Sequence, residues 1–79
     1  MPELLVFTSK SCVPCHKMIE NLEKENIPFK ALDVNANPEE VKKFHVRCTP
    51  TIVHVKDNGE ANSLFGFRSV REIRKSFCL

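Results

Sequence analysis

Two cysteines separated by two residues are the feature of this sequence that most directly implies chemistry. Cys12 and Cys15 lie in segment 11–15, which reads Ser-Cys-Val-Pro-Cys. A disulfide between them closes a very short loop, so it stabilises the fold little by restricting the unfolded chain. In a reducing compartment, a close cysteine pair more often serves catalysis or metal binding. The spacing therefore predicts a CxxC dithiol that alternates between two thiols and a disulfide.

The predicted elements around the dithiol give its two sulfurs different roles. Residues 4–8 form an apolar run typical of a buried strand, and apolar residues then recur at helical spacing from position 12 to position 22. The free N–H groups of a first helical turn, with Lys10 nearby, favour a thiolate at Cys12, which we expect at an exposed helix start. Cys15, one turn further, is expected to be more buried. We therefore expect Cys12 to attack a disulfide and Cys15 to resolve the mixed disulfide, with Pro14 stiffening the loop between them.

The other elements needed to position the dithiol follow from turn and capping patterns. Strands are predicted at 29–34, 51–56 and 61–65, and the Asn-Gly step at 58–59 predicts a hairpin between the last two. Segment 37–40, Asn-Pro-Glu-Glu, predicts a helix start with Asn37 as its cap, and Ser69 to Glu72 is a capping box that opens a last helix. The order β-α-β-α-β-β-α predicts one α/β domain over residues 1–79.

Composition excludes several functional classes. The chain has 79 residues and a net charge of +2, with Lys and Arg interleaved with Asp and Glu, which does not favour nucleic-acid binding. No apolar run approaches a membrane span, and the start has no signal-peptide pattern. We therefore expect a cytoplasmic protein, without membrane or nucleic-acid partners, that acts as a monomer.

A metal site is the alternative from a different class. Cys12 and Cys15, followed by His45 and Cys48 at the spacing H-x-x-C, supply four nominal ligands for zinc or an iron–sulfur cluster. Zinc ligands usually lie on loops, whereas the first pair here opens an amphipathic helix. The metal interpretation stays open but is not favoured.

The arrangement resembles the thioredoxin superfamily. The strand–CxxC–helix opening is followed, just before the third strand, by Thr49-Pro50. The resemblance implies a minimal thioredoxin fold, a four-stranded mixed sheet flanked by three helices. It also implies that Pro50 is cis and lies against the dithiol, and that the backbone of Thr49 binds the substrate strand. Thioredoxins carry a buried Asp six residues before the first cysteine, where this sequence has Val6.

Within the superfamily, the length is that of a glutaredoxin, and two segments resemble NrdH-type redoxins. These segments are 12–16, Cys-Val-Pro-Cys-His, and 66–68, Gly-Phe-Arg. The resemblance implies a protein disulfide reductase that receives electrons from thioredoxin reductase and passes them to ribonucleotide reductase. It implies no cofactor beyond the reversible disulfide, and substrate contacts at Val13, Gly66 and Phe67. Gly66 would allow a close backbone approach, and Phe67 would be an exposed aromatic.

The second alternative is a glutathione-dependent glutaredoxin. Glutaredoxins bind glutathione partly through a Gly-Gly pair and an Asp near the last helix, and segment 66–69 has one Gly and no Asp. Lys10, Thr49 and Arg68 remain as groups for its carboxylates. His16 is expected to face solvent, and neither Cys48, near the docking loop, nor Cys78, near the end of the last helix, is given a role.

Overall fold

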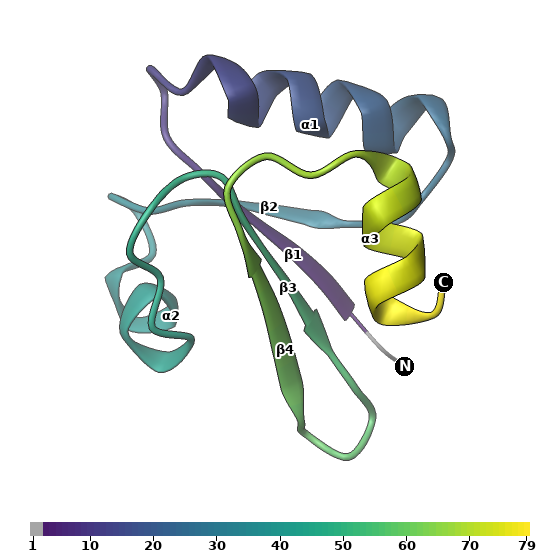
Figure 1. Ribbon diagram of the computed structural model, residues 1–79. Helices are drawn as coiled ribbons and strands as arrows, with labels where there is room; N and C mark the ends of the chain where they lie inside the picture. Colours follow the sequence, from purple (N-terminus) through teal and green to yellow (C-terminus); the bar gives the residue numbers. More distant parts are fainter. Residues whose placement is uncertain (1–2) are drawn as a thin grey trace.

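The structure is a computed structural model that describes residues 3–79 (Figure 1). Within this part of the chain the elements follow the predicted order. The strands are β1 (Glu3–Thr8), β2 (Lys30–Asp33), β3 (Thr51–Val55) and β4 (Ala61–Phe65), and the helices are α1 (Val13–Lys24), α2 (Pro38–Lys43) and α3 (Val70–Phe77). The predicted minimal thioredoxin fold, with its four-stranded mixed sheet and three helices, is confirmed.

The sheet has the strand order β2-β1-β3-β4, so β1 is a central strand. β1 pairs parallel with β2 and antiparallel with β3, and the parallel pair is connected by α1, as a parallel crossover requires. β3 and β4 form the predicted antiparallel hairpin, whose turn has Gly59 at φ 89°. Phe7 lies opposite Thr51, which brings the loop before β3 to the end of β1 from which the chain turns toward Cys12.

β1 contributes to the apolar core on both faces of the sheet. Leu4 and Val6 pack into the cluster that includes residues of α1 and α3, whereas Leu5 and Phe7 pack into the cluster contacted by α2. Figure 1 shows this division, with α1 and α3 over one face and α2 over the other. The prediction that the first strand is buried on both faces is confirmed.

α1 buries one face against the sheet, as its apolar spacing predicts. Cys15, Met18 and Leu22 are its buried residues. The helix ends at Lys24, and Asn26 then adopts a left-handed conformation at φ 55°, a conformation that Asn accepts more readily than most residues. At 12 residues α1 is the longest helix in the described range 3–79, and none there is long and apolar enough to cross a membrane.

Asn37 is the N-cap residue of α2, as the sequence predicts, although its side chain has a different role. The side chain makes no capping hydrogen bond. Its Nδ2 donates instead to the backbone oxygen of Asp33 at 2.9 Å. The amide therefore ties the end of β2 to the start of α2 rather than satisfying the N–H groups of the helix, and α2 extends for only 6 residues.

The cap predicted for α3 is present, and it yields a stability prediction. Ser69 Oγ accepts a hydrogen bond from the Glu72 N–H at 3.2 Å and lies 3.2 Å from the Glu72 carboxylate. Because Ser69→Ala leaves that N–H without its partner, we expect a loss of about 1 kcal/mol in the free energy of unfolding. Thermal denaturation should show a melting temperature lower by about 4–8 °C. Ser76→Ala, within the same helix, is the matched control and should change the melting temperature little.

Candidate functional site

The dithiol stands at the junction between β1 and α1. Cys12 is the N-cap residue of α1, and its backbone N–H donates to the Ser9 oxygen at 3.2 Å, which closes the turn after β1. Cys12 and Cys15 form a disulfide with their Cα atoms 5.3 Å apart. Cys15 is completely buried, whereas 8% of Cys12 is exposed. The prediction that Cys15 is more buried than Cys12 is confirmed.

The start of α1 supplies a favourable field at the first sulfur. Cys12 Sγ accepts a hydrogen bond from the Cys15 N–H at 3.2 Å, in the manner of an N-cap side chain. No acidic residue lies in the first turn. A thiolate at Cys12 would therefore meet a backbone donor and the positive end of the helix dipole, both of which stabilise negative charge.

The expectation that Cys12 stands exposed is wrong. The residue is mostly buried because its sulfur turns inward over the first turn of α1, where it bonds to Cys15 and accepts the Cys15 N–H. The exposed part of the loop is Val13, with 76% of its surface accessible, followed by Pro14 in the first turn. Val13 therefore presents an exposed apolar side chain next to the dithiol.

A second segment reaches the same end of the sheet. The Thr49–Pro50 peptide bond is cis, as the resemblance implied, and Pro50 is buried. Thr51 Oγ1 donates to the Cys48 oxygen at 2.7 Å, which fixes the loop just before β3. Ser9 and Thr49 line one hollow together, so the cis-proline loop lies beside the turn that carries Cys12.

Segment 65–68 is the third part of the chain at this end of the sheet, and Gly66 connects it to the cis-proline loop by a hydrogen bond. The Gly66 N–H donates to the Pro50 oxygen at 2.8 Å, which holds segment 65–68 beside the cis-proline loop. The sequence suggests that Gly66 suits a close backbone approach to the active site; its backbone does lie close to Pro50, but a Cβ at this position would meet no protein atom within 4 Å. Glycine suits the position because φ is +84°, a conformation that side chains disfavour.

A matched pair of glycine substitutions separates strain from function. Gly59 in the hairpin turn has a similar φ, +89°, and equal free space, but no part in the dithiol end of the sheet. Gly66→Ala and Gly59→Ala should each cost about 1–2 kcal/mol in the free energy of unfolding. We expect only Gly66→Ala to slow disulfide reduction, by severalfold, because it shifts the loop beside Pro50. Equal activity of the two variants would contradict this role.

Comparisons with known proteins agree with this geometry. Residues 1–77 match the family model described as Thioredoxin. The chain belongs to the thioredoxin family. It is 37% identical to the SPbeta prophage-derived thioredoxin-like protein YosR of Bacillus subtilis (strain 168), over 82% of each chain. It is 34% identical to thioredoxin H5 of Oryza sativa subsp. japonica over 80% of this chain, but it spans only 50% of the length of that relative. Oxidised mitochondrial thioredoxin 3 of Saccharomyces cerevisiae superposes with a TM-score of 0.83 at 26% identity, covering 98% of this chain and 76% of that one.

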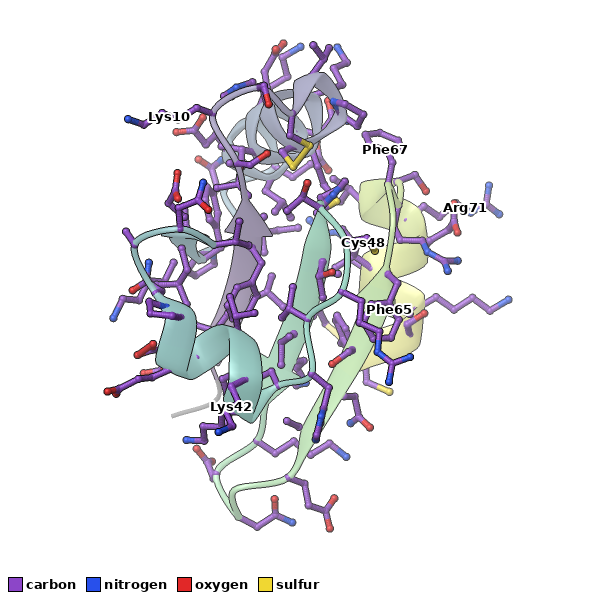
Figure 2. The ribbon with its side chains drawn as sticks, turned by 90° about the vertical axis from the view of Figure 1, so that its left-hand side faces the viewer. Lys10, Lys42, Cys48, Phe65, Phe67 and Arg71 are labelled. Atoms are coloured by element: carbon purple, nitrogen blue, oxygen red, sulfur yellow. A yellow bond between two sulfur atoms is a disulfide. The ribbon has the colours of Figure 1, made fainter. Side chains whose placement is uncertain are left out.

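Two aromatic side chains of segment 65–67 are exposed, and Figure 2 shows Phe67 nearer to the disulfide than Phe65. Phe67 is 46% exposed, which confirms the sequence prediction, and so is Phe65 at the end of β4. Sequence reasoning missed Phe65. The alternation of side chains along a strand could have identified it, because Leu64 contacts the core and its neighbour must then face outward.

Lys10 and His16 lie on the outside of this thioredoxin site. In Figure 2 the Lys10 side chain points away from the disulfide, so its charge does not contact the sulfurs. His16 is exposed, as expected, and its Nε2 lies 3.3 Å from the Lys10 backbone oxygen. Val6, which replaces the acidic residue of other thioredoxins, is completely buried in the apolar cluster with Met18. None of these side chains places a base at Cys15.

The metal alternative finds no support in the geometry. Within residues 3–79, no three His, Cys, Asp or Glu side chains come together in a group that could hold a metal ion. Cys12 and Cys15 are bonded to each other, and His45 and Cys48 do not complete a ligand set with them. Cys48 and Cys78 are free and exposed.

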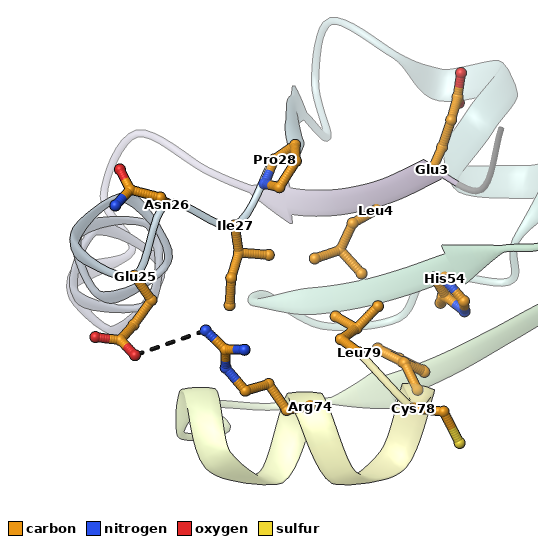
Figure 3. A pocket seen from close by; sticks show the side chains of 11 residues that line it. Glu3, Leu4, Glu25, Asn26, Ile27, Pro28, His54, Arg74, Cys78 and Leu79 are labelled. Carbon is orange, nitrogen blue, oxygen red and sulfur yellow. Dashed lines mark ion pairs between the residues drawn. The ribbon is translucent and has the colours of Figure 1, made fainter.

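A further hollow of about 560 Å³ lies at the opposite end of the thioredoxin fold (Figure 3). Glu25 and Arg74 form an ion pair across it at 3.7 Å. The buried His54 lines it and stacks on Phe77, with ring centroids 5.1 Å apart. Leu4, opposite His54 in the sheet, places this hollow at the start of β1, whereas the dithiol follows its end. The hollow therefore lies apart from the Cys12–Cys15 pair, although Cys78 is among its lining residues.

Proposed function

We propose that this chain is a thiol–disulfide oxidoreductase that carries two electrons to protein disulfides. The observation that carries the proposal is the CxxC disulfide at the start of α1, in which Cys12 keeps a small exposed surface and Cys15 is completely buried. The family membership of the chain agrees with it. A disulfide in this position has no structural purpose that the apolar core does not already fulfil, because it closes so short a loop.

The two sulfurs take different steps in the proposed cycle. In the reduced protein, the Cys12 thiolate attacks one sulfur of a substrate disulfide, and the other substrate sulfur leaves as a thiolate. Cys15 then loses its proton and attacks Cys12 in the mixed disulfide. This step releases the second substrate sulfur and closes the Cys12–Cys15 bond. The substrate gains two electrons, and the protein must be reduced again before the next turnover.

The other site residues have supporting roles in this proposal. Pro14 and the buried cis Pro50 fix the backbone on either side of the sulfurs, and the Thr49 backbone is the group that pairs with the substrate chain. Val13 and Phe67 present exposed apolar surface to the substrate. Lys10 contributes only to the field around the site, since its side chain points away from the disulfide in Figure 2.

We further propose that the electrons come from thioredoxin reductase. The segment beside the site contains the single Gly66 and no acidic residue, which argues against a glutathione site of the glutaredoxin kind. The chain is similar to thioredoxins in sequence. Ribonucleotide reductase enters as a substrate only through the likeness of segment 66–68 to NrdH-type redoxins.

The test compares two electron sources with one disulfide substrate. Insulin reduction is measured with thioredoxin reductase and NADPH, and separately with glutathione, glutathione reductase and NADPH. We expect turnover with the first system and little with the second. Turnover with glutathione alone would reject the proposed electron source, and a reduced protein that transfers no electrons to insulin would reject the proposed function.

A further inference from the structure

The three segments that surround the dithiol carry positive charge without compensation from their own residues. Segments 8–16, 45–50 and 65–71 contain four basic side chains and no Asp or Glu. These basic side chains are Lys10, Arg47, Arg68 and Arg71. Because the net charge of the whole chain is +2, the remainder of the chain is net negative. The positive charge is therefore concentrated around the site.

On one side of the site, Arg47 stands at a hollow lined by both polar and apolar residues. The hollow has a volume of about 510 Å³ and is lined by Ser9, Thr49 and apolar residues that include Val34 and Val46. Arg47 is the charged residue of this lining and takes part in no ion pair within residues 3–79. A substrate chain that pairs with Thr49 would pass directly beside it.

Two carboxylates, Asp33 and Glu40, directly precede residues that line this hollow, and neither forms an ion pair with Arg47 within residues 3–79. Asp33 ends β2, and its Oδ1 accepts the Asn35 N–H at 2.8 Å. The Asp33 carboxylate therefore caps its own turn. The positive charge of Arg47 remains available to a partner.

On the other side of the site, positive charge lies next to the exposed aromatic rings. Arg68 is bound by Glu72 at 3.5 Å and by the Phe65 oxygen at 3.4 Å, so its charge is partly compensated. Arg71, in the first turn of α3, forms no ion pair within residues 3–79. Figure 2 shows Lys10 and Arg71 extending on opposite sides of the disulfide, with Phe67 between the disulfide and Arg71.

We propose that this face selects disulfides that lie in acidic protein segments. The inference rests on the proposed function and adds the class of substrate. A segment that crosses the dithiol places apolar side chains against Val13 and Phe67, and its carboxylates meet Arg47 on one side and Arg71 on the other. Such complementarity raises the rate of encounter and suppresses partners of the wrong charge more than it changes the chemistry at sulfur.

The experiment uses three peptides that share one cystine loop. The residues flanking the two cysteines are Glu in the first peptide, Gln in the second and Lys in the third. The protein is reduced, freed of reductant and mixed with each oxidised peptide; the second-order rate constant of electron transfer is measured after acid quenching and thiol alkylation. Each rate constant is divided by that for dithiothreitol, a neutral reductant, which removes the intrinsic reactivity of each peptide disulfide.

We expect the normalised rate constants to fall in the order Glu, Gln, Lys. At about 0.01 M ionic strength, where charges act over roughly 30 Å, the first and last should differ about tenfold. At about 1 M, where that distance is roughly 3 Å, they should agree within about twofold. Arg47→Glu and Arg71→Glu should each reduce the preference at low salt by about threefold or more. Lys42→Glu is the matched control, because it makes the same charge change on α2, well away from the disulfide in Figure 2.

The possible outcomes separate the inference from the function beneath it. Equal normalised rates for the three peptides overturn the proposed selection while disulfide exchange stands. A loss of preference in Lys42→Glu as large as in the two arginine variants also overturns it. The preference among the peptides would then depend on the net charge of the protein and not on the charges of this face. If no peptide is reduced, the proposed function fails and the inference fails with it. Circular dichroism confirms that each variant is folded before its rates are compared.

Discussion

Cys12→Ser is expected to abolish disulfide reduction, whereas Cys15→Ser is expected to retain the first half of the reaction. Cys12 is the residue of the CxxC pair that retains accessible surface, so its loss leaves only the completely buried Cys15 in the dithiol. A serine hydroxyl at that position is not ionised and does not exchange with disulfides. In Cys15→Ser, Cys12 still attacks, but nothing displaces the substrate from it.

The measurement is turnover of insulin together with mass spectrometry of the protein after mixing. Cys12→Ser should show turnover at least about a thousandfold below the unmodified protein and no adduct at the dithiol. Cys15→Ser should accumulate a covalent adduct that dithiothreitol removes. Cys48→Ser is the matched control, because Cys48 is also exposed but lies outside the CxxC pair, and it should keep full turnover. Residual turnover in Cys12→Ser would show that another thiol is the nucleophile.

Phe7→Ala is expected to have the largest effect on stability. Phe7 is completely buried at the centre of the sheet and packs at 6.1 Å, ring centroid to ring centroid, against Phe44. Removing its ring from such a site costs about 3–5 kcal/mol, since the cavity closes only in part. A domain of this size has a total free energy of unfolding of roughly 4–12 kcal/mol. The variant should therefore lose a large fraction of its stability.

Urea denaturation followed by circular dichroism measures this loss. Phe65→Ala is the matched control, because it makes the same chemical change at an aromatic ring that is 46% exposed. We expect that control to change the free energy of unfolding by about 0.5 kcal/mol or less. A small effect at both positions would show that the α2 side of the sheet is less tightly packed than the structure indicates.

The sequence predicts a secondary-structure element correctly where one clear residue pattern determines its type and position. The apolar run of β1, the helical spacing of α1 and the capping box at Ser69 each admit one arrangement, and the structure shows it. The site could be predicted because its chemistry depends on two cysteines three positions apart. The likeness of segment 49–50 to thioredoxins then supplied the cis proline, which local sequence does not determine.

The structural features that the sequence did not predict are hydrogen bonds and contacts for which a residue has several possible partners. Asn37 has a donor as well as an acceptor, and it uses the donor on Asp33 rather than the acceptor on α2. Cys12 is less exposed than expected, because its sulfur bonds inward. Gly66 is required by its φ angle, which becomes known only once its hydrogen bond to Pro50 is seen. These interactions depend on the three-dimensional arrangement of the chain, so local sequence patterns do not predict them.

The central place of β1 has a consequence for the motions of the molecule. β1 is hydrogen-bonded on both edges and packed on both faces, whereas β2 and β4 each have one unpaired edge within the described sheet. Its amide protons should therefore exchange with solvent only when the whole domain unfolds, and those of β2 and β4 should also exchange through smaller local openings. The chain leaves β1 directly into the turn that carries Cys12. We therefore expect the nucleophile to be attached to a slowly exchanging part of the domain, and local opening of the edge strands to leave its position unchanged.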